Sequence, residues 1–512
     1  MRLNLIVQPF TLYSMNLNKQ RLFFGILFIL LIICTFILAY GYLRPGHQMM
    51  GDFALYLRQI QAIWQGDGRQ VYNDMAFMLS NSSNDVYSPI LYPWGFSILM
   101  APFYPFFGLN HLAYKIVIAL FFTGAIVMIY LTFKSKENFR WQALLIAALI
   151  AVQPKYLSWM NMVLSEMPYL FFVMLSLYTL NRIYSNKEIK ASQTPAYIGL
   201  GILLMFTAQI RTEGILLFPA LAVSHLYYLY CNPGQWTSWK KAPRFLLTVA
   251  TPYLSGFIFF IILSLIFPSG FLKHTDHFEF TSTIRVLANI IGYFRSLQQF
   301  PLLSVSWAVI LFLLVTLWGI IERLPKDLPE AAFLLFSFAL LLIWPHQNTR
   351  HLFALLPFML YFFAQGLSSI PLRIFKLQWS VYVLLALFLW ILPGTIRASV
   401  KNYRAANRHQ PYGTDSQAAQ EMFEYLKTHT SPTDVIGYAH ARTTYLYTGR
   451  RTIAIWGNTE IFWTPADWYV WNIHGGSFMQ YSKEVLEEYG NEITETFRNK
   501  DYVVYKINKN GH

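Results

Sequence analysis

Long apolar runs recur along this chain from Leu22 to Trp390, separated by shorter polar loops. A helix needs about 20 mainly apolar residues to cross a hydrocarbon layer of about 30 Å. The pattern therefore predicts an α-helical polytopic membrane protein. We expect about eleven transmembrane helices, near residues 22–42, 110–133, 141–158, 167–184, 196–210, 213–230, 245–267, 301–321, 331–345, 352–370 and 378–394.

The loop between the first two expected helices, residues 43–109, contains two patterned segments of its own. Apolar residues recur at helical spacing over 51–64, which predicts an amphipathic helix lying on the membrane surface with Asp52 in its first turn. The segment 87–108 is apolar but holds four prolines and two glycines. Because proline interrupts a helix, we expect a broken helix that lines a cavity there.

Beyond Ile396 the pattern changes, since charged residues occur throughout and no apolar run is long enough to span a membrane. Two helices and two strands are expected in this part of the chain, at 418–426, 484–489, 433–439 and 501–507 respectively. We therefore divide the chain into a transmembrane domain, 1–395, and a small soluble α/β domain, 396–512.

Composition supports the membrane assignment, because 55% of the residues are hydrophobic and only 12% are charged. The net charge of +14 would suit a nucleic-acid partner, but its distribution does not. Basic residues precede the first helix and then gather in every second loop, for example at 134–140 and 182–190. The positive-inside rule places these loops and the N-terminus in the cytoplasm. An odd number of spans then places the C-terminal domain outside, and no nucleic-acid partner is expected.

Two acidic residues are candidates for chemistry at this outer face. Asp52 stands at the start of an expected helix, where aspartate also serves as an ordinary N-cap. Glu166 stands at the outer start of a span, where an ionisable group is costly and commonly functional. A carboxylate in a first turn also interacts favourably with the helix dipole. Both interpretations stay open for each residue.

Arg211 and Arg350 lie in tight outer turns, and a guanidinium can hold two phosphate oxygens at once. Either arginine could instead anchor to lipid headgroups, and Arg211 could pair with nearby Glu213. Tyr92 could stack on a sugar or belong to an interfacial belt of aromatic residues.

The outer loop 268–300 carries a cluster of residues that metals accept as ligands. Its members are His274, Asp276, His277 and Glu279. The cluster is a possible site for a divalent cation, although an ordinary polar loop has the same composition. No other cofactor is expected.

Four segments on the expected outer face form a recurring pattern. They are an acid after the first helix followed by a Tyr-Pro-x-Gly-Phe stretch, an acidic loop, an Arg-x-Glu-Gly turn and a late arginine-containing loop, beginning at Asp52, Asn161, Gln209 and Asn348. In this order the pattern resembles the GT-C glycosyltransferases, especially the protein mannosyltransferases and the lipid A aminoarabinose transferases. The resemblance covers about residues 20–395. It departs at Asn84-Asp85-Val86, where the aminoarabinose transferases have a lysine.

The resemblance implies a glycosyltransferase that moves a sugar from a polyprenyl-phosphate donor to an acceptor at the outer face of the cell membrane. The acceptor would be a glycolipid, a glycan or a protein. Displacement with inversion needs a base for the acceptor's proton, a role the resemblance gives to Asp52. Glu166 is the second candidate catalytic residue, which could orient the acceptor, share a proton with Asp52 or help to hold a metal. The residues placed in the substrate-binding site are Tyr92, Arg211, Glu213, Arg350 and His351.

Three other functions use a similar membrane architecture. A transporter or flippase of lipid-linked glycans would show repeats and paired broken helices, whereas this chain shows one broken segment and no repeat. A glycan polymerase or ligase with a diphosphate-linked donor would have one very large central loop. A non-catalytic sensor would not need acids at membrane depth.

Overall fold

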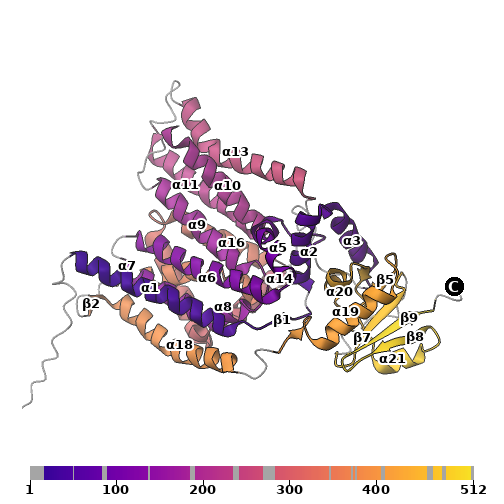
Figure 1. The fold of residues 1–512 in the computed structure, drawn as a ribbon. Helices are drawn as coiled ribbons and strands as arrows, with labels where there is room; N and C mark the ends of the chain where they lie inside the picture. The colour runs from indigo at the N-terminus through magenta and orange to yellow at the C-terminus, as the bar shows by residue number, and fades with distance from the viewer. Residues whose placement is uncertain are drawn as a thin grey trace, which may run out of the picture.

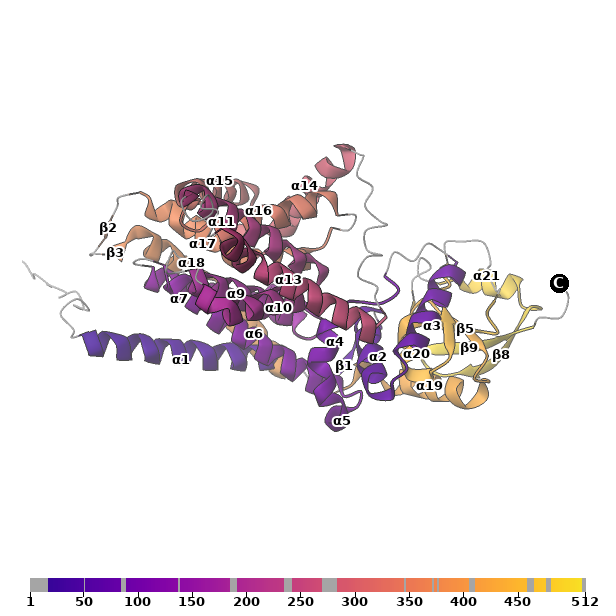
Figure 2. The ribbon, with the colours of Figure 1, turned by 90° about the horizontal axis from the view of Figure 1, so that it is seen from above.

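The chain, seen here in a computed structural model, has a domain of long packed helices joined at one end to a small domain that contains a sheet (Figure 1). Figure 2 shows the same division from above. The structure describes residues 17–49, 51–83, 89–136, 139–184, 191–233, 242–268, 283–344, 347–370, 373–374, 377–404, 410–457, 465–475 and 480–508.

Helices lie at all of the expected spans. They are α1 (Leu17–Tyr42), α6 (His111–Lys134), α7 (Arg140–Ala151), α9 (Glu166–Tyr184), α10 (Thr194–Ile210), α11 (Leu217–Cys231), α13 (Ala242–Ile266), α15 (Ser306–Arg323), α16 (Leu328–Ile343), α17 (Leu356–Ser368) and α18 (Trp379–Arg404). Among the described residues, six helical segments are long and apolar enough to cross a membrane. A multi-pass membrane protein is thereby confirmed, while the count of eleven spans and their orientation stay predictions.

The expected helix over 51–64 is present as α2 (Gly51–Gln65), and its apolar stripe packs against other parts of the protein. Phe53, Leu57 and Ile60 are completely buried against the rest of the protein. Gln59 is buried as well, and its side-chain amide donates to the backbone carbonyl of Tyr92 over 2.9 Å. Amphipathicity identifies a helix with one buried face, but it does not distinguish a lipid neighbour from a protein neighbour.

The loop 43–109 contains further short helices after α2. It contains α3 (Gly68–Asn81), α4 (Gly95–Met100), the 3₁₀ helix η2 (Ala101–Phe103) and α5 (Tyr104–Phe107). The break of the 95–107 segment into three short helices agrees with the broken helix expected from its prolines.

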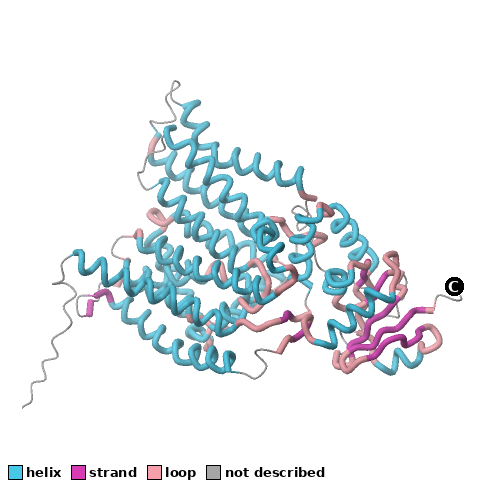
Figure 3. Tube along the Cα trace, in the orientation of Figure 1, coloured by secondary structure: helices cyan, strands magenta, loops and turns pink. Residues whose placement is uncertain are grey.

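The C-terminal domain contains a mixed five-stranded sheet in the order β6-β5-β7-β9-β8. Its strands are β5 (Val435–Gly437), β6 (Arg451–Ile453), β7 (Trp468–Asn472), β8 (Ile493–Arg498) and β9 (Tyr502–Ile507). Strand β5 runs parallel to β6 and β7, whereas β7, β9 and β8 are antiparallel. The accompanying helices are α19 (Gln417–His429), α20 (Ala441–Thr448) and α21 (Lys483–Glu488). Figure 3 shows the strands confined to this end of the chain, apart from two short pairs.

One of these short pairs joins the two domains. Strand β1 (Gly46–His47), just after α1, pairs in parallel with β4 (Tyr412–Gly413), just before α19. The His47 ring is buried and stacks on Phe53 at 3.8 Å between ring centroids, and its Nε2 accepts from the Val163 amide over 3.0 Å. Burial lowers the pKa of His47 to about 3, so this ring stays neutral and keeps that acceptor. The junction thereby holds the start of α2 against the membrane domain.

Helix α14 (Thr283–Gln298) occupies part of the loop 268–300, where the hydrophobic pattern predicts no span. The amide of its Asn289 donates to the carbonyls of Leu342 and Trp344, both over 2.8 Å, at the end of α16. The last carbonyls of an α-helix have no partner within it, and Asn289 supplies hydrogen bonds at this end of α16. The contact places α14 beside the late arginine-containing loop.

Candidate active site

A cavity of about 350 Å³ lies among α2, the start of α9, the turn after α10 and the 3₁₀ helix η7 (Thr349–Leu352). All seven residues that the sequence places in the site line it: Asp52, Tyr92, Glu166, Arg211, Glu213, Arg350 and His351. They come from segments up to about 300 residues apart in the chain. Their shared position is a geometric fact, whereas their roles stay predictions.

Asp52 is in the first turn of α2, one residue inside the helix, and both of its carboxylate oxygens have partners. Tyr92 donates its hydroxyl to Oδ1 over 2.8 Å, and Arg350 donates Nη1 to Oδ2 over 2.9 Å. Burial alone would raise the pKa of Asp52, but the charge and hydrogen bond of Arg350 and the hydroxyl of Tyr92 outweigh it and lower the pKa below its usual value. Asp52 is therefore ionised at neutral pH, with 29% of its side chain exposed to the cavity.

Two glycines of the sequence pattern bring the neighbouring segments close together. A Cβ atom at Gly95 would lie 2.5 Å from the carbonyl carbon of Gln209, so only glycine lets α4 approach the end of α10 this closely. A Cβ atom at Gly214 would lie 2.7 Å from the amide nitrogen of Ala208. The first glycine thus positions Tyr92 near Arg211, and the second permits the tight reversal that follows Arg211.

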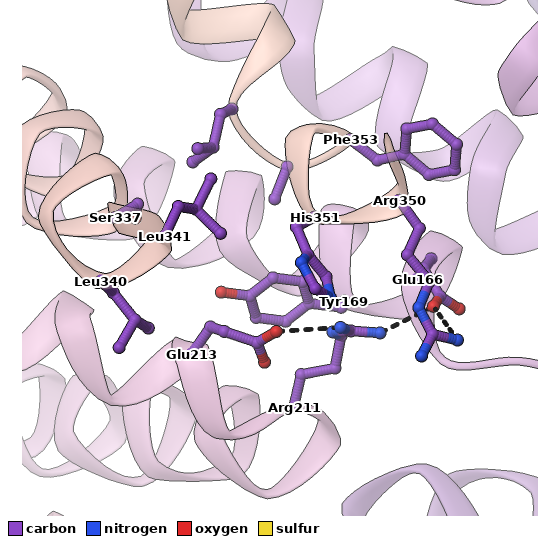
Figure 4. Close-up of a pocket in the computed structure, with 12 residues that line it drawn as sticks. Glu166, Tyr169, Arg211, Glu213, Ser337, Leu340, Leu341, Arg350, His351 and Phe353 are labelled. Atoms are coloured by element: carbon purple, nitrogen blue, oxygen red, sulfur yellow. Dashed lines mark hydrogen bonds and ion pairs between the residues drawn. The ribbon is translucent and has the colours of Figure 1, made fainter. Parts of the chain in front are cut away.

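Arg211 links two carboxylates where the cavity adjoins a second, smaller pocket, and Figure 4 shows this pocket with Arg211 between Glu166 and Glu213. Its Nη1 lies 2.8 Å from Oε1 of Glu166, and its Nη2 lies 2.9 Å from Oε1 of Glu213. Only 5% of the Glu166 side chain is exposed, and its second oxygen has no hydrogen-bond partner among the described residues. Arg211 therefore forms the expected ion pair with Glu213 and, in addition, an ion pair with Glu166.

Arg350 stands between the two candidate acids. Besides its bond to Asp52, its Nη1 lies 3.6 Å from Oε1 of Glu166. The neighbouring His351 ring is hydrogen-bonded at Nδ1 to the hydroxyl of Tyr293 on α14 over 2.9 Å. Three carboxylates and two arginines thus share one partly exposed hollow.

Several residues of this cavity are absent from the sequence-based prediction. Tyr56 stacks on Tyr92 at 4.5 Å between centroids, and Trp344 and Gln347 line the wall beside η7. Tyr56 belongs to the apolar stripe of α2, so its pattern signals burial rather than function. Trp344 and Gln347 adjoin the late arginine loop, and this proximity was the only available signal.

The possible metal cluster at His274 lies outside the described residues. Within the described part of the chain, no group of three or more His, Cys, Asp or Glu side chains is placed to hold a metal ion. Asp52 accepts from Arg350, and Glu166 accepts from Arg211.

Tyr92→Phe is expected to lower the rate of the reaction at this site by about tenfold, because a hydrogen bond to a charged group contributes about 1.5–3 kcal/mol. The substitution keeps the stacking on Tyr56 and removes only the donor to Asp52. The pKa of Asp52 then rises, and activity is lost at a higher pH as the solution is acidified. A pH–rate profile measures both effects. Tyr104→Phe is the matched control, since the Tyr104 hydroxyl binds Gln61 outside the cavity. A profile like that of the unchanged protein would show that the hydroxyl does not act on Asp52.

One family of known proteins matches part of the chain. Residues 91–274 match the family described as dolichyl-phosphate-mannose-protein mannosyltransferase. No curated protein sequence matches the chain at a significant level.

Solved structures resemble the fold. The apo structure of ArnT from Cupriavidus metallidurans is 13% identical with a TM-score of 0.52, and the match covers 95% of this chain and 98% of ArnT. The archaeal oligosaccharyltransferase AglB from Archaeoglobus fulgidus, in complex with an inhibitory peptide and a dolichol-phosphate, is 12% identical with a TM-score of 0.52. That match covers 83% of this chain and 64% of AglB, so the chain spans somewhat less than two thirds of the oligosaccharyltransferase. At these identities the likeness concerns the fold.

The chain thus has a fold similar to that of ArnT, with a small α/β domain beside a helical membrane domain, and a cavity of acids and arginines lies near their junction. The match to the dolichyl-phosphate-mannose-protein mannosyltransferase family is confined to residues 91–274.

Proposed function

We propose that this protein transfers a sugar from a polyprenyl-phosphate donor to an acceptor hydroxyl or amine at the outer face of the membrane, with inversion at the sugar carbon. The observation that carries the proposal is the position of Asp52. Its carboxylate is ionised and partly exposed in a cavity that also contains Arg211 and Arg350. A base and an anion-binding group therefore face the same space, as displacement of a phosphate by an acceptor requires.

In the proposed reaction the acceptor attacks the sugar carbon on the side opposite the phosphate. Asp52 takes the acceptor's proton while the bond between the sugar carbon and the phosphate oxygen breaks with its electron pair. Arg211 and Arg350 stabilise the negative charge that develops on the departing polyprenyl phosphate. The products are the glycosylated acceptor, the polyprenyl phosphate and a protonated Asp52.

Arg350 couples donor binding to the strength of the base. In the structure it hydrogen-bonds Asp52 and helps to lower its pKa, which makes the carboxylate a weak base. A donor phosphate competes for the same guanidinium. When Arg350 turns to the phosphate, burial and the remaining neighbours determine the pKa of Asp52, which rises toward its ordinary value. Asp52 would thereby become a better base when the donor is present.

Glu166 and Glu213 hold Arg211 from two sides, which fixes its guanidinium in the cavity wall. Glu166 is almost completely buried and has one oxygen without a described partner, so we place it as an orienting group for the acceptor and for the two arginines. His351 and Tyr92 complete the binding surface for the sugar and its carrier.

The outer location of the reaction is supported by the C-terminal domain. This domain packs against α2, which carries Asp52, so the cavity and the soluble domain lie on the same side of the membrane. Basic loops concentrate at the opposite ends of the spans, as expected for the cytoplasmic side.

The proposal is tested by mass spectrometry of cell-envelope glycolipids and glycoproteins from a strain that lacks the gene, with and without the wild-type chain restored. We expect one sugar modification to disappear and to return with the wild-type protein. The purified protein in lipid nanodiscs should then transfer that sugar from its polyprenyl-phosphate carrier. An unchanged glycan profile, together with a changed distribution of the carrier lipid across the membrane, would identify a flippase instead.

A further inference from the structure

The C-terminal domain reaches the candidate catalytic base through α20. This helix packs along α2, and the two lie side by side in Figure 1 and Figure 2. Its second residue, Arg442, points toward the first turn of α2 and is only 7% exposed. A Cβ atom added at Gly51, the residue before Asp52, would lie 3.3 Å from Cδ of Arg442. The arginine is therefore in contact with the backbone that carries Asp52.

The contacts of Arg442 are with the Tyr-Pro segment that holds Tyr92. Its Nη2 donates to the carbonyl of Pro89, and its guanidinium carbon lies 5.7 Å from the centre of the Tyr92 ring. Cation–π attraction operates at this distance. Pro89 and Tyr92 both line the cavity, and Tyr92 donates its hydroxyl to Asp52. Arg442 thus contacts both the residue that precedes the proposed base and the segment that carries Tyr92, but it does not line the cavity itself.

We propose that Arg442 is a positioning residue for sugar transfer, which holds Tyr92 on Asp52 and adds a positive charge behind the base. The inference rests on the proposed function and assigns the C-terminal domain a part in it. The active site is then shared between the domains, since the base comes from the first outer loop and its support from α20.

The burial of this arginine argues against a purely structural role. A buried guanidinium is costly unless it is paired, and the Nε of Arg442 has no hydrogen-bond partner among the described residues. An apolar side chain would fill the same space between α20 and α2 without that cost. The positive charge has a use where it lies, because Arg442 helps Arg350 and Tyr92 to keep Asp52 ionised in its buried position.

The acid limb of a pH–rate profile reports the pKa of Asp52, which depends on the ionisable groups around it. Arg350 comes from η7, Tyr92 from the segment before α4 and Arg442 from α20, while Tyr56 of α2 and Glu166 of α9 lie further along the cavity. Loss of one cation from this set raises the pKa of Asp52. Since Asp52 acts only when ionised, the acid limb of the profile then moves to higher pH.

The test compares Arg442→Gln and Arg442→Lys in the full-length protein in nanodiscs, with kcat measured across the acid limb. We expect Arg442→Gln to lower kcat by about ten- to a hundredfold and to move the acid limb to higher pH, because displaced groups around a reacting centre cost about this much. Arg442→Lys keeps the charge but loses the planar contact with Tyr92. It should restore the acid limb while kcat stays reduced.

Arg450→Gln is the matched control within the same domain. Arg450 donates to the carbonyls of Lys427 and Thr430, which lie within the C-terminal domain itself. Its loss should weaken the domain without moving the acid limb. A wild-type rate and profile in Arg442→Gln, or a loss equal to that of Arg450→Gln with no shift, would overturn the proposal. If Arg442→Gln does not accumulate, a wild-type kcat in Arg442→Lys overturns it. These outcomes are separate from failure of the proposed function, which would appear as full activity in Asp52→Asn.

Discussion

Asp52→Asn is expected to lower the rate of sugar transfer by about 10²- to 10⁴-fold, the contribution of a positioned general base. The amide has nearly the same size as the carboxylate and can still accept from Tyr92, so the cavity should keep its shape. It cannot take the acceptor's proton. Binding of the donor should persist, because Arg211 keeps both of its carboxylate partners and Arg350 loses one competitor for phosphate.

The measurement is single-turnover transfer from a labelled polyprenyl-phosphate sugar, with donor binding measured separately. Asp67→Asn is the matched control, since Asp67 lies just beyond the same helix and pairs with Arg58 outside the cavity. We expect the control to keep its rate within about twofold, as for a partly exposed ion pair of low energy. A wild-type rate in Asp52→Asn would falsify the assignment of Asp52 as the base.

Arg350→Gln is expected to lower kcat/KM by about 10²- to 10³-fold, the size of effect seen when one preorganised donor to a developing charge is removed. The substitution has two consequences. The donor phosphate loses a cation, which raises KM and slows departure of the phosphate. Asp52 loses the neighbour that most lowers its pKa, so activity should fail at a higher pH on acidification.

Two variants separate these consequences. Arg350→Lys retains the charge without the planar fork, so the acid limb should stay near that of the wild type while kcat/KM falls by less than in Arg350→Gln. Arg295→Gln removes an exposed arginine from α14 outside the cavity and should change neither quantity. An Arg350→Gln protein with the wild-type KM and acid limb would show that Arg350 touches neither the phosphate nor the working base.

Much of the architecture can be predicted from the sequence alone, because the hydrophobic pattern of a helix or strand depends only on neighbouring residues. The period and length of the apolar runs predict helices where α1, α6 and α13 are found, and alternation predicts the β5 and β9 strands. The site residues were predicted through short motifs whose glycines mark places of close approach. The structure explains Gly95 and Gly214 by the backbone each one faces.

Other features depend on which surfaces meet. The apolar stripe of α2 has the same appearance whether lipid or protein covers it, and here the membrane domain and α20 cover it. The pairing of Arg350 with both Asp52 and Glu166 joins three distant segments, and no spacing in the chain encodes it.

The sequence by itself therefore determined a multi-pass helical protein with a small α/β domain, because helix length and hydrophobic period follow from neighbouring residues and the thickness of a bilayer. It also supplied the seven residues that line the cavity. Only the tertiary structure decided how these residues are paired, that α2 is a buried support for Asp52 and that Arg442 lies behind it. Hydrogen bonds and ion pairs between distant segments depend on distances of a few ångströms, which arise only when the packed helices bring those segments together.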